Sequence, residues 1–202
     1  MISTEEVLRQ ALAAHQMGDF AGAVAGYRAH LASNPDNPAV HLQLGVALRQ
    51  LGRLAEAETS YRRALVLQPG YAEASGNLAL CLNLQGRHAE AAANAEKALE
   101  LKPDLLSAVF ALAVARHRQD HLQDAELLYR RVLASVPAFA EALVNLGALC
   151  LAQGRWDEAE NNLREVLTLN PTLAEAHCNL GVALRQQGQA AAAEAIKGVR
   201  VI

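Results

Sequence analysis

The apolar residues between positions 38 and 51 recur at steps of three and four, which predicts an amphipathic helix. They are Val40, Leu44, Ala47, Leu48 and Leu51. Gly52 follows, and glycine adopts the left-handed conformation that commonly ends a helix without steric cost. A second apolar stripe predicts a helix over residues 54–67, which Pro69 prevents from continuing. The segment is therefore predicted to form a helical hairpin.

The same pattern returns every 34 residues along the chain. Proline keeps this step at Pro35, Pro69, Pro103, Pro137 and Pro171. Alanine keeps it at Ala23, Ala57, Ala91, Ala125, Ala159 and Ala193. A fixed period of this size is typical of a solenoid, in which each copy buries its apolar faces against its neighbours. One all-α domain of antiparallel helical hairpins is predicted over residues 1–202, with repeats 4–37, 38–71, 72–105, 106–139 and 140–173 and a partial repeat 174–202.

Two positions of the repeat, counted from its first residue, predict how each hairpin is built. The turn position holds Gly18, Gly52, Gly86, Asp120, Gly154 and Gly188. Aspartate tolerates the left-handed conformation better than most residues, so the fourth repeat is predicted to make the same turn. Position 8 holds only small residues, namely Ala11, Gly45, Ala79, Ala113, Gly147 and Gly181. Small side chains there predict a close approach of the two helices.

The composition agrees with close-packed helices and narrows the functional classes. Apolar residues make up 52% of the chain and aromatic residues only 4%. A net charge of −3 without a basic cluster argues against a nucleic-acid footprint, and no apolar run is long enough to span a membrane. The start, from Met1 to Gln10, does not have the pattern of a secretory signal, and Ser3 and Glu6 are predicted to form a capping box there. We predict a cytoplasmic location.

Neither the cysteines nor the histidines predict chemistry. Cys150 and Cys178 fall on neighbouring helices at heights that differ by roughly 9 Å, so reduced thiols are predicted. His117 and His121 are four residues apart, but the second falls after the helix end. No zinc spacing, phosphate-binding glycine loop or catalytic triad is recognisable in the sequence. The chain is therefore predicted to have no metal, no cofactor and no enzymatic activity.

The residues Leu44, Gly45, Gly52, Ala57, Tyr61, Ala64, Leu65 and Pro69 stand in the order and spacing of the tetratricopeptide repeat. The chain closely resembles that family over residues 4–173, which implies a right-handed superhelix. There are departures from its pattern. The aromatic residue at position 24 survives as Tyr27, Tyr61 and Tyr129 but is replaced by Ala95 and Leu163. The aromatic residue preferred at position 4 is replaced throughout, by Val7, His41, Ser75, Val109, Leu143 and His177.

The resemblance implies that the first helices of the hairpins line a concave groove that binds a peptide or protein segment. The predicted groove residues are Gln43, Arg49, Asn77, Asn83, Phe110, His117, Arg118, Asn145, Asn179 and Arg185. The clamp by which chaperone adaptors of the family hold a carboxylate is absent, because Leu8 and Leu12 occupy its lysine and asparagine positions. Position 6 instead carries Asn77, Asn145 and Asn179, with Ala111 interrupting the row. This row resembles the asparagine ladder of the arrays attached to O-linked N-acetylglucosamine transferases.

An amide side chain offers both a donor and an acceptor, so it can hold a peptide backbone without reading its sequence. The arginines of the groove predict a preference for acidic ligands. Asparagine at position 6 is also common in the family without a binding role, which is the alternative explanation of the row. The opposite surface carries Glu58 and Arg62, Glu126 and Arg130, and Glu160 and Arg164, which are pairs of a solvated outer face.

A protein-interaction scaffold is the leading functional hypothesis. The alternative is the substrate-recruiting arm of a larger enzyme of the glycosyltransferase type. RNA reading by related repeats of 35 residues disagrees with the 34-residue step and the acidic balance. Lys197 and Arg200 stand where apolar residues are expected in the sixth repeat, and no polar capping helix follows them in this sequence. We therefore predict self-association through the C-terminal end.

Overall fold

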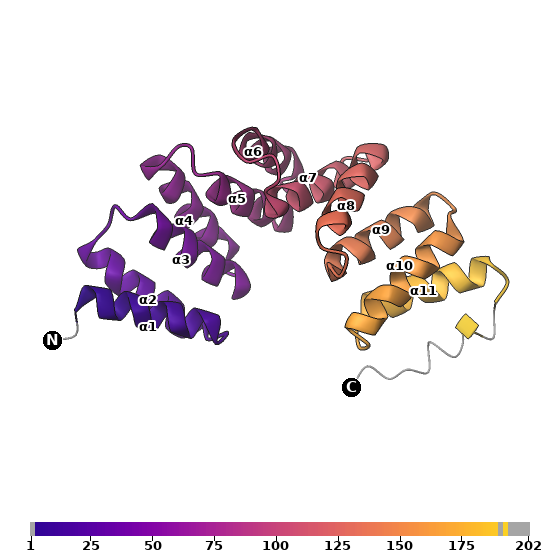
Figure 1. The fold of residues 1–202 in the computed structure, drawn as a ribbon, viewed down its shortest axis with the longest axis horizontal. Coiled ribbons are helices and arrows are strands. Elements are labelled where there is room, and N and C mark those ends of the chain that lie inside the picture. Colours follow the sequence, from indigo (N-terminus) through magenta and orange to yellow (C-terminus); the bar gives the residue numbers. More distant parts are fainter. Residues whose placement is uncertain (1–2, 190–191, 194–202) are drawn as a thin grey trace. The chain divides into compact units, whose positions relative to one another are not determined.

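The computed structural model describes residues 3–189, 192 and 193, and within these residues it contains helices and no strand. In chain order, two helices fall in each of the five complete predicted repeats, and α11 (Ala174–Gln186) begins the partial repeat (Figure 1). Their bounds are α1 (Thr4–Gln16), α2 (Phe20–Ser33), α3 (Pro38–Gln50), α4 (Leu54–Leu67), α5 (Ala72–Leu84), α6 (His88–Leu101), α7 (Leu106–Arg118), α8 (Leu122–Ser135), α9 (Ala140–Ala152), α10 (Trp156–Leu169) and α11 (Ala174–Gln186). The predicted all-α architecture of helical hairpins is confirmed.

The chain divides into two compact units, Met1–Ala115 and Arg116–Ile202. In the first unit, α1 packs on α2, α3 on α4 and α5 on α6, and the hairpins join through α2 with α3 and α4 with α5. In the second unit, α8 packs on α9, α9 on α10 and α10 on α11. Each unit is therefore a stack of hairpins held by neighbouring helices, as a solenoid requires. The single domain over residues 1–202 stays a prediction.

The turns within the hairpins have the predicted backbone. Gly52 has φ +72°, and the amide of Arg53 donates to the carbonyl of Leu48 at 2.9 Å in the pattern of a Schellman motif. Asp120 has φ +64°, and the amide of His121 donates to Arg116 at 2.9 Å in the same way. Aspartate therefore makes the turn that glycine makes in the other hairpins.

The helices of a hairpin approach closely at position 8, as predicted. A Cβ atom added to Gly45 would lie 2.5 Å from Cε1 of Tyr61, and one added to Gly147 would lie 2.9 Å from Cγ of Leu163. The recurring alanines on the second helices are fully buried, as Ala57 and Ala125 show. Glycine or alanine is needed at these positions because a larger side chain would separate the two helices.

The predicted capping box at the start of α1 is only half formed. Ser3 Oγ accepts from the amide of Glu6 at 3.1 Å, as expected of an N-cap. The Glu6 carboxylate turns to the helix surface instead, where Gln10 Nε2 donates to it at 3.0 Å and Arg9 forms an ion pair with it. Residues three and four positions further along lie on the same side of a helix, so they compete with the cap for this carboxylate.

The predicted outer ion pairs form, and two of them extend to the next hairpin. Arg62 lies 2.8 Å from Glu58, Arg130 lies 2.9 Å from Glu126 and Arg164 lies 2.7 Å from Glu160. The first two pairs are joined to the next hairpin by Arg87, which lies 2.7 Å from Glu58, and by Arg155, which lies 2.7 Å from Glu126. Neighbouring hairpins within each unit are therefore linked by charge as well as by apolar contact.

The three cysteines are free thiols, in agreement with the prediction. Cys81 and Cys150 are buried, and burial raises the pKa of the Cys150 thiol to about 11. Cys178 is exposed, so it is not part of the core. Lys197 and Arg200, on which the prediction of self-association rests, lie outside the described residues.

Candidate functional site

The candidate site residues lie on the first helix of each hairpin, and the division of the chain places them on two separate surfaces. We call the surface of α1, α3, α5 and α7 up to Ala115 the unit-1 face, and the surface of α9 and α11 the unit-2 face. Two pairs of these first helices contact each other directly: α3 packs against α5, and α9 packs against α11. Equivalent side chains on such helices therefore form rows.

The unit-1 face is largely apolar. Position 9 of its four helices carries Leu12, Val46, Leu80 and Val114, none of which is fully buried. Leu84 on α5 is 62% exposed, and Phe110 on α7 is half-buried. Two amides accompany this strip, Gln43 and Asn77, and the Asn77 Nδ2 group donates to the carbonyl of Glu73 at 2.8 Å.

Position 12 faces the interior of the hairpin rather than a ligand. His15 Nδ1 lies 2.9 Å from the hydroxyl of Tyr27, and His117 Nδ1 lies 3.3 Å from that of Tyr129. Arg49 occupies the same place beside Tyr61. Burial raises the pKa of Tyr61 to about 12, and the neighbouring guanidinium opposes this rise. Arg49 and His117 are therefore placed by the structure as contacts of the hairpin.

Asn83 is also engaged within the fold. Its Nδ2 group donates to the carbonyl of Ala111 on α7 at 2.7 Å, and its Oδ1 atom lies 3.1 Å from Nδ1 of His88. Both ends of this amide thus connect α5 to other helices of the first unit. A role in ligand binding, which the sequence suggested, would compete with these two bonds.

A signal for these interior contacts is present in the sequence. Tyr27, Tyr61 and Tyr129 each stand twelve residues after a histidine or an arginine, at His15, Arg49 and His117. Where the tyrosine is replaced by Ala95 or Leu163, the partner position holds Asn83 or Leu151. The two helices of an antiparallel hairpin bring such positions together, so the sequence alone could have predicted this pairing.

The unit-2 face is polar. Asn145 and Asn179 occupy the same position on the contacting helices α9 and α11, and both side chains are half-buried. Asn145 Nδ2 donates to the carbonyl of Glu141 at 2.7 Å. This bond uses one of the two N–H groups of the Asn145 amide and does not involve its Oδ1 atom. Arg185 is exposed further along α11. Arg118, at the end of α7, is exposed as well.

The hydrogen bond from the Asn145 side chain to the carbonyl four residues earlier does not by itself indicate a binding site. Asn94 on α6 and Asn162 on α10 make the same bond to the carbonyl four residues earlier, at 2.8 and 2.9 Å. These two residues lie on second helices. What distinguishes Asn145 and Asn179 is that they occupy the same position of the repeat on two first helices that contact each other.

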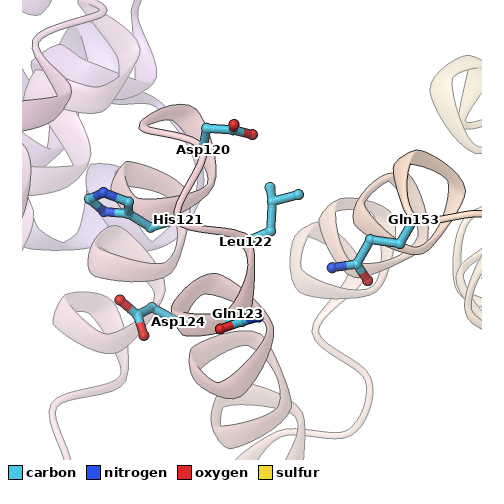
Figure 2. Close-up of a pocket in the computed structure, with 6 residues that line it drawn as sticks. All are labelled: Asp120, His121, Leu122, Gln123, Asp124 and Gln153. Carbon is cyan, nitrogen blue, oxygen red and sulfur yellow. The ribbon is translucent and has the colours of Figure 1, made fainter.

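A cavity of about 440 Å³ lies in the second unit, where the turn before α8 faces the end of α9 (Figure 2). It is lined by Asp120, His121, Leu122, Gln123, Asp124 and Gln153. In the first unit the glutamine equivalent to Gln153, Gln85, donates to the carbonyl of Leu54 at 3.3 Å. Gln153 lies across the cavity from Leu122 (Figure 2). Nothing in the sequence indicated this opening, which combines two carboxylates and an imidazole without a nucleophile.

Two features are absent from the described part of the chain. No group of three or more histidine, cysteine, aspartate or glutamate side chains that could hold a metal ion is found among them. No described helix is both long enough and apolar enough to cross a membrane.

Stacked hairpins with a 34-residue step place this chain in the class of α-solenoid repeat proteins. It belongs to the tetratricopeptide repeat family. Models described as "Tetratricopeptide repeat" match residues 8–72, 55–105 and 116–164, and a model described as "TPR repeat" matches residues 149–188. No curated protein sequence matches the chain significantly.

Solved structures share this fold. PilW, a type IV pilus biogenesis factor, has a TM-score of 0.83 at 24% identity, over 96% of this chain and 90% of PilW. A thermophilic repeat protein in Thermus thermophilus has a TM-score of 0.73 at 20% identity, over 91% of this chain and all (100%) of its own. YrrB, a repeat protein with an unusual peptide-binding site, has a TM-score of 0.62 at 20% identity, over 84% of this chain and 88% of YrrB.

Proposed function

We propose that the chain is a non-enzymatic protein-interaction scaffold that holds an extended segment of a partner against the first helices of its hairpins. The observation that carries the proposal is the row formed by Asn145 and Asn179 on the contacting helices α9 and α11. Each side chain has a donor and an acceptor suited to a peptide backbone. Among proteins of the same fold, YrrB is described as having a peptide-binding site.

The unit-1 face supports the same function with a different chemistry. Its strip of partly exposed Leu12, Val46, Leu80 and Val114 would accept apolar side chains of a partner, while Gln43 and Asn77 would contact its backbone. An exposed apolar strip beside polar groups is typical of a surface that binds other proteins. The resemblance of the asparagine row to the ladder of the O-linked N-acetylglucosamine transferase arrays remains part of this proposal.

The alternative function is that of a substrate-recruiting arm of a glycosyltransferase-type enzyme. It uses the same faces in the same way and differs only in what is joined to the chain. Reading the coding sequence beyond Ile202 distinguishes the two, because a transferase domain in the same frame supports the recruiting arm.

The test begins with short random peptides selected for binding to the chain. The affinity of each selected peptide is then measured by fluorescence anisotropy with the parent and with the double variant Asn145→Ala and Asn179→Ala. Losing two backbone contacts should weaken binding by about 1–3 kcal/mol, which is roughly a 5- to 150-fold increase in Kd. Far-UV circular dichroism should show no loss of helix.

A matched control comes from the second helices. Asn94→Ala and Asn162→Ala remove the same back-bonded amide chemistry from α6 and α10, away from the first-helix faces. This control should bind the peptides as the parent does. Equal binding by the Asn145 and Asn179 variant would remove the amide row from the mechanism.

A further inference from the structure

Two carboxylates accompany the asparagine row on the unit-2 face. Glu141 and Glu175 each stand four residues before an asparagine of the row, Asn145 and Asn179, and so lie on the same side of their helices. Both glutamates are exposed. Neither has an ion-pair partner among the residues that the structure describes. The face therefore presents a row of two negative charges parallel to its row of two amides.

The same position in the first unit shows what neutralises such a carboxylate. Glu73 forms an ion pair with Lys102, and this hydrogen-bonded ammonium group holds the pKa of Glu73 below its usual value. The residue that corresponds to Lys102 in the repeat of Glu141 is Asn170. Its Oδ1 atom accepts from the hydroxyl of Thr172 at 3.1 Å. Glu141 thus lacks the internal cation that Glu73 has.

The arginine of the unit-2 face, Arg185, lies far from the two glutamates. Arg185 is ten residues beyond Glu175 on α11, which is about 15 Å along the helix axis. A charge at that distance is largely screened from an exposed carboxylate at physiological salt. The preference for acidic ligands that the arginines predicted thus does not apply at the edge formed by the two glutamates.

The spacing of the two rows selects a peptide conformation. Packed helices lie about 8–10 Å apart, so the two glutamates are separated by about one such step. A polyproline II chain rises about 9 Å over three residues and returns its side chains to the same side with that period. A β-strand points residues i and i+3 to opposite sides. The rows therefore match a polyproline II segment better than a strand.

We propose that the unit-2 face binds a polyproline II segment of a partner protein that carries lysine or arginine at positions i and i+3. The backbone of the segment lies over Asn145 and Asn179, and the two basic side chains pair with Glu141 and Glu175. This inference rests on the proposed function, since it names the chemistry of the ligand that the same face holds.

The probe is a labelled peptide of proline, alanine and two lysines that stand three residues apart. Three comparison peptides replace the lysines with glutamine, replace them with glutamate, or place them next to each other. Fluorescence anisotropy with the parent at about 50 mM salt should show the lysine peptide binding about tenfold more tightly than the glutamine peptide. At about 500 mM salt this advantage should shrink, because the carboxylates are exposed.

The double variant Glu141→Gln and Glu175→Gln should lose the advantage of the lysine peptide and keep the affinity for the glutamine peptide. Glu100→Gln and Glu165→Gln make the same charge change at exposed sites on the second helices α6 and α10, and this control should keep the advantage. An advantage that survives in the Glu141 and Glu175 variant overturns the proposal. So does equal binding of the peptide with adjacent lysines.

Failure of this inference can be told apart from failure of the proposed function. Equal binding of the lysine, glutamine and glutamate peptides, with all three weakened by Asn145→Ala and Asn179→Ala, overturns the basic motif and leaves the peptide scaffold standing. Affinities for all these peptides that are unchanged by the asparagine variant overturn both.

Discussion

One substitution, made at the same position of two hairpins, should have different effects on stability. Tyr27 and Tyr61 are both fully buried on the second helices α2 and α4. The hydroxyl of Tyr27 lies 2.9 Å from Nδ1 of His15. The hydroxyl of Tyr61 and the Nε atom of Arg49 have no hydrogen-bond partner among the described residues. Phenylalanine keeps the ring in both places and removes only the hydroxyl.

The expected magnitudes follow from what each hydroxyl contacts. Tyr27→Phe removes a formed hydrogen bond and should lower the free energy of unfolding by about 1 kcal/mol. Tyr61→Phe removes a buried hydroxyl that lacks a partner, so it should leave stability unchanged or raise it by up to about 1–2 kcal/mol. The two variants should therefore differ by at least about 1 kcal/mol.

Urea unfolding followed by far-UV circular dichroism measures this difference. With a slope of about 1–3 kcal/mol per molar urea, a loss of 1 kcal/mol moves the midpoint by about 0.3–1 M. Both tyrosines lie in the first unit, so they report on the same part of the chain. If Tyr61→Phe costs as much as Tyr27→Phe, Arg49 completes the bond to Tyr61 in solution and the reasoning is refuted.

Four other outcomes are expected. Ala125→Leu should cost about 1–3 kcal/mol in urea unfolding, because Ala125 is fully buried and a leucine would overpack its surroundings; a change within about half a kcal/mol would show that this alanine is not at a close helix contact. Asp120→Gly should raise the melting temperature, since glycine adopts φ +64° without strain; a lower melting temperature would show that the aspartate side chain stabilises the turn. Burial lowers the pKa of His15 and His117 below 6.5, so the stability that their neutral rings contribute is complete above pH 6.5 and is lost as the pH falls through their folded-state values. Melting should thus occur at a lower temperature at pH 5 than at pH 7, and equal values would contradict this. The predicted self-association through the C-terminal end should appear in light scattering at high protein concentration as a mass above that of the monomer. A monomeric mass would contradict this prediction.

Much of the fold was predictable because its determinants are local. The 34-residue step, the glycines of the turns and the prolines predicted the hairpins, and α4 begins and ends at the predicted residues, Leu54 and Leu67. Asp120 was recognised as a turn residue for the same reason, since backbone conformation depends on the residue itself. The capping-box prediction for Glu6 was partly wrong, because its carboxylate has several partners within reach and the sequence alone does not rank them.

The candidate site was less predictable. Position 12 of the repeat lies at the border between the face of a first helix and the interior of its hairpin. Whether Arg49, Asn83 or His117 points to a ligand or to the second helix depends on the residue across the hairpin, and in all three the side chain lies against a group of the fold itself. Asn145 and Asn179, at position 6, are partly accessible on first helices, where the sequence placed them.

The sequence by itself determined the helices, the turns and the rows of equivalent side chains, because each of these follows from spacing along one chain. The tertiary structure decided which carboxylates are neutralised. Glu73 meets Lys102 across 29 residues of sequence, while Asn170 in the corresponding place makes its bond to Thr172 and leaves Glu141 without a cation. Such pairings depend on distances between side chains that only the packed hairpins set, and they determine the charge that each face presents to a partner.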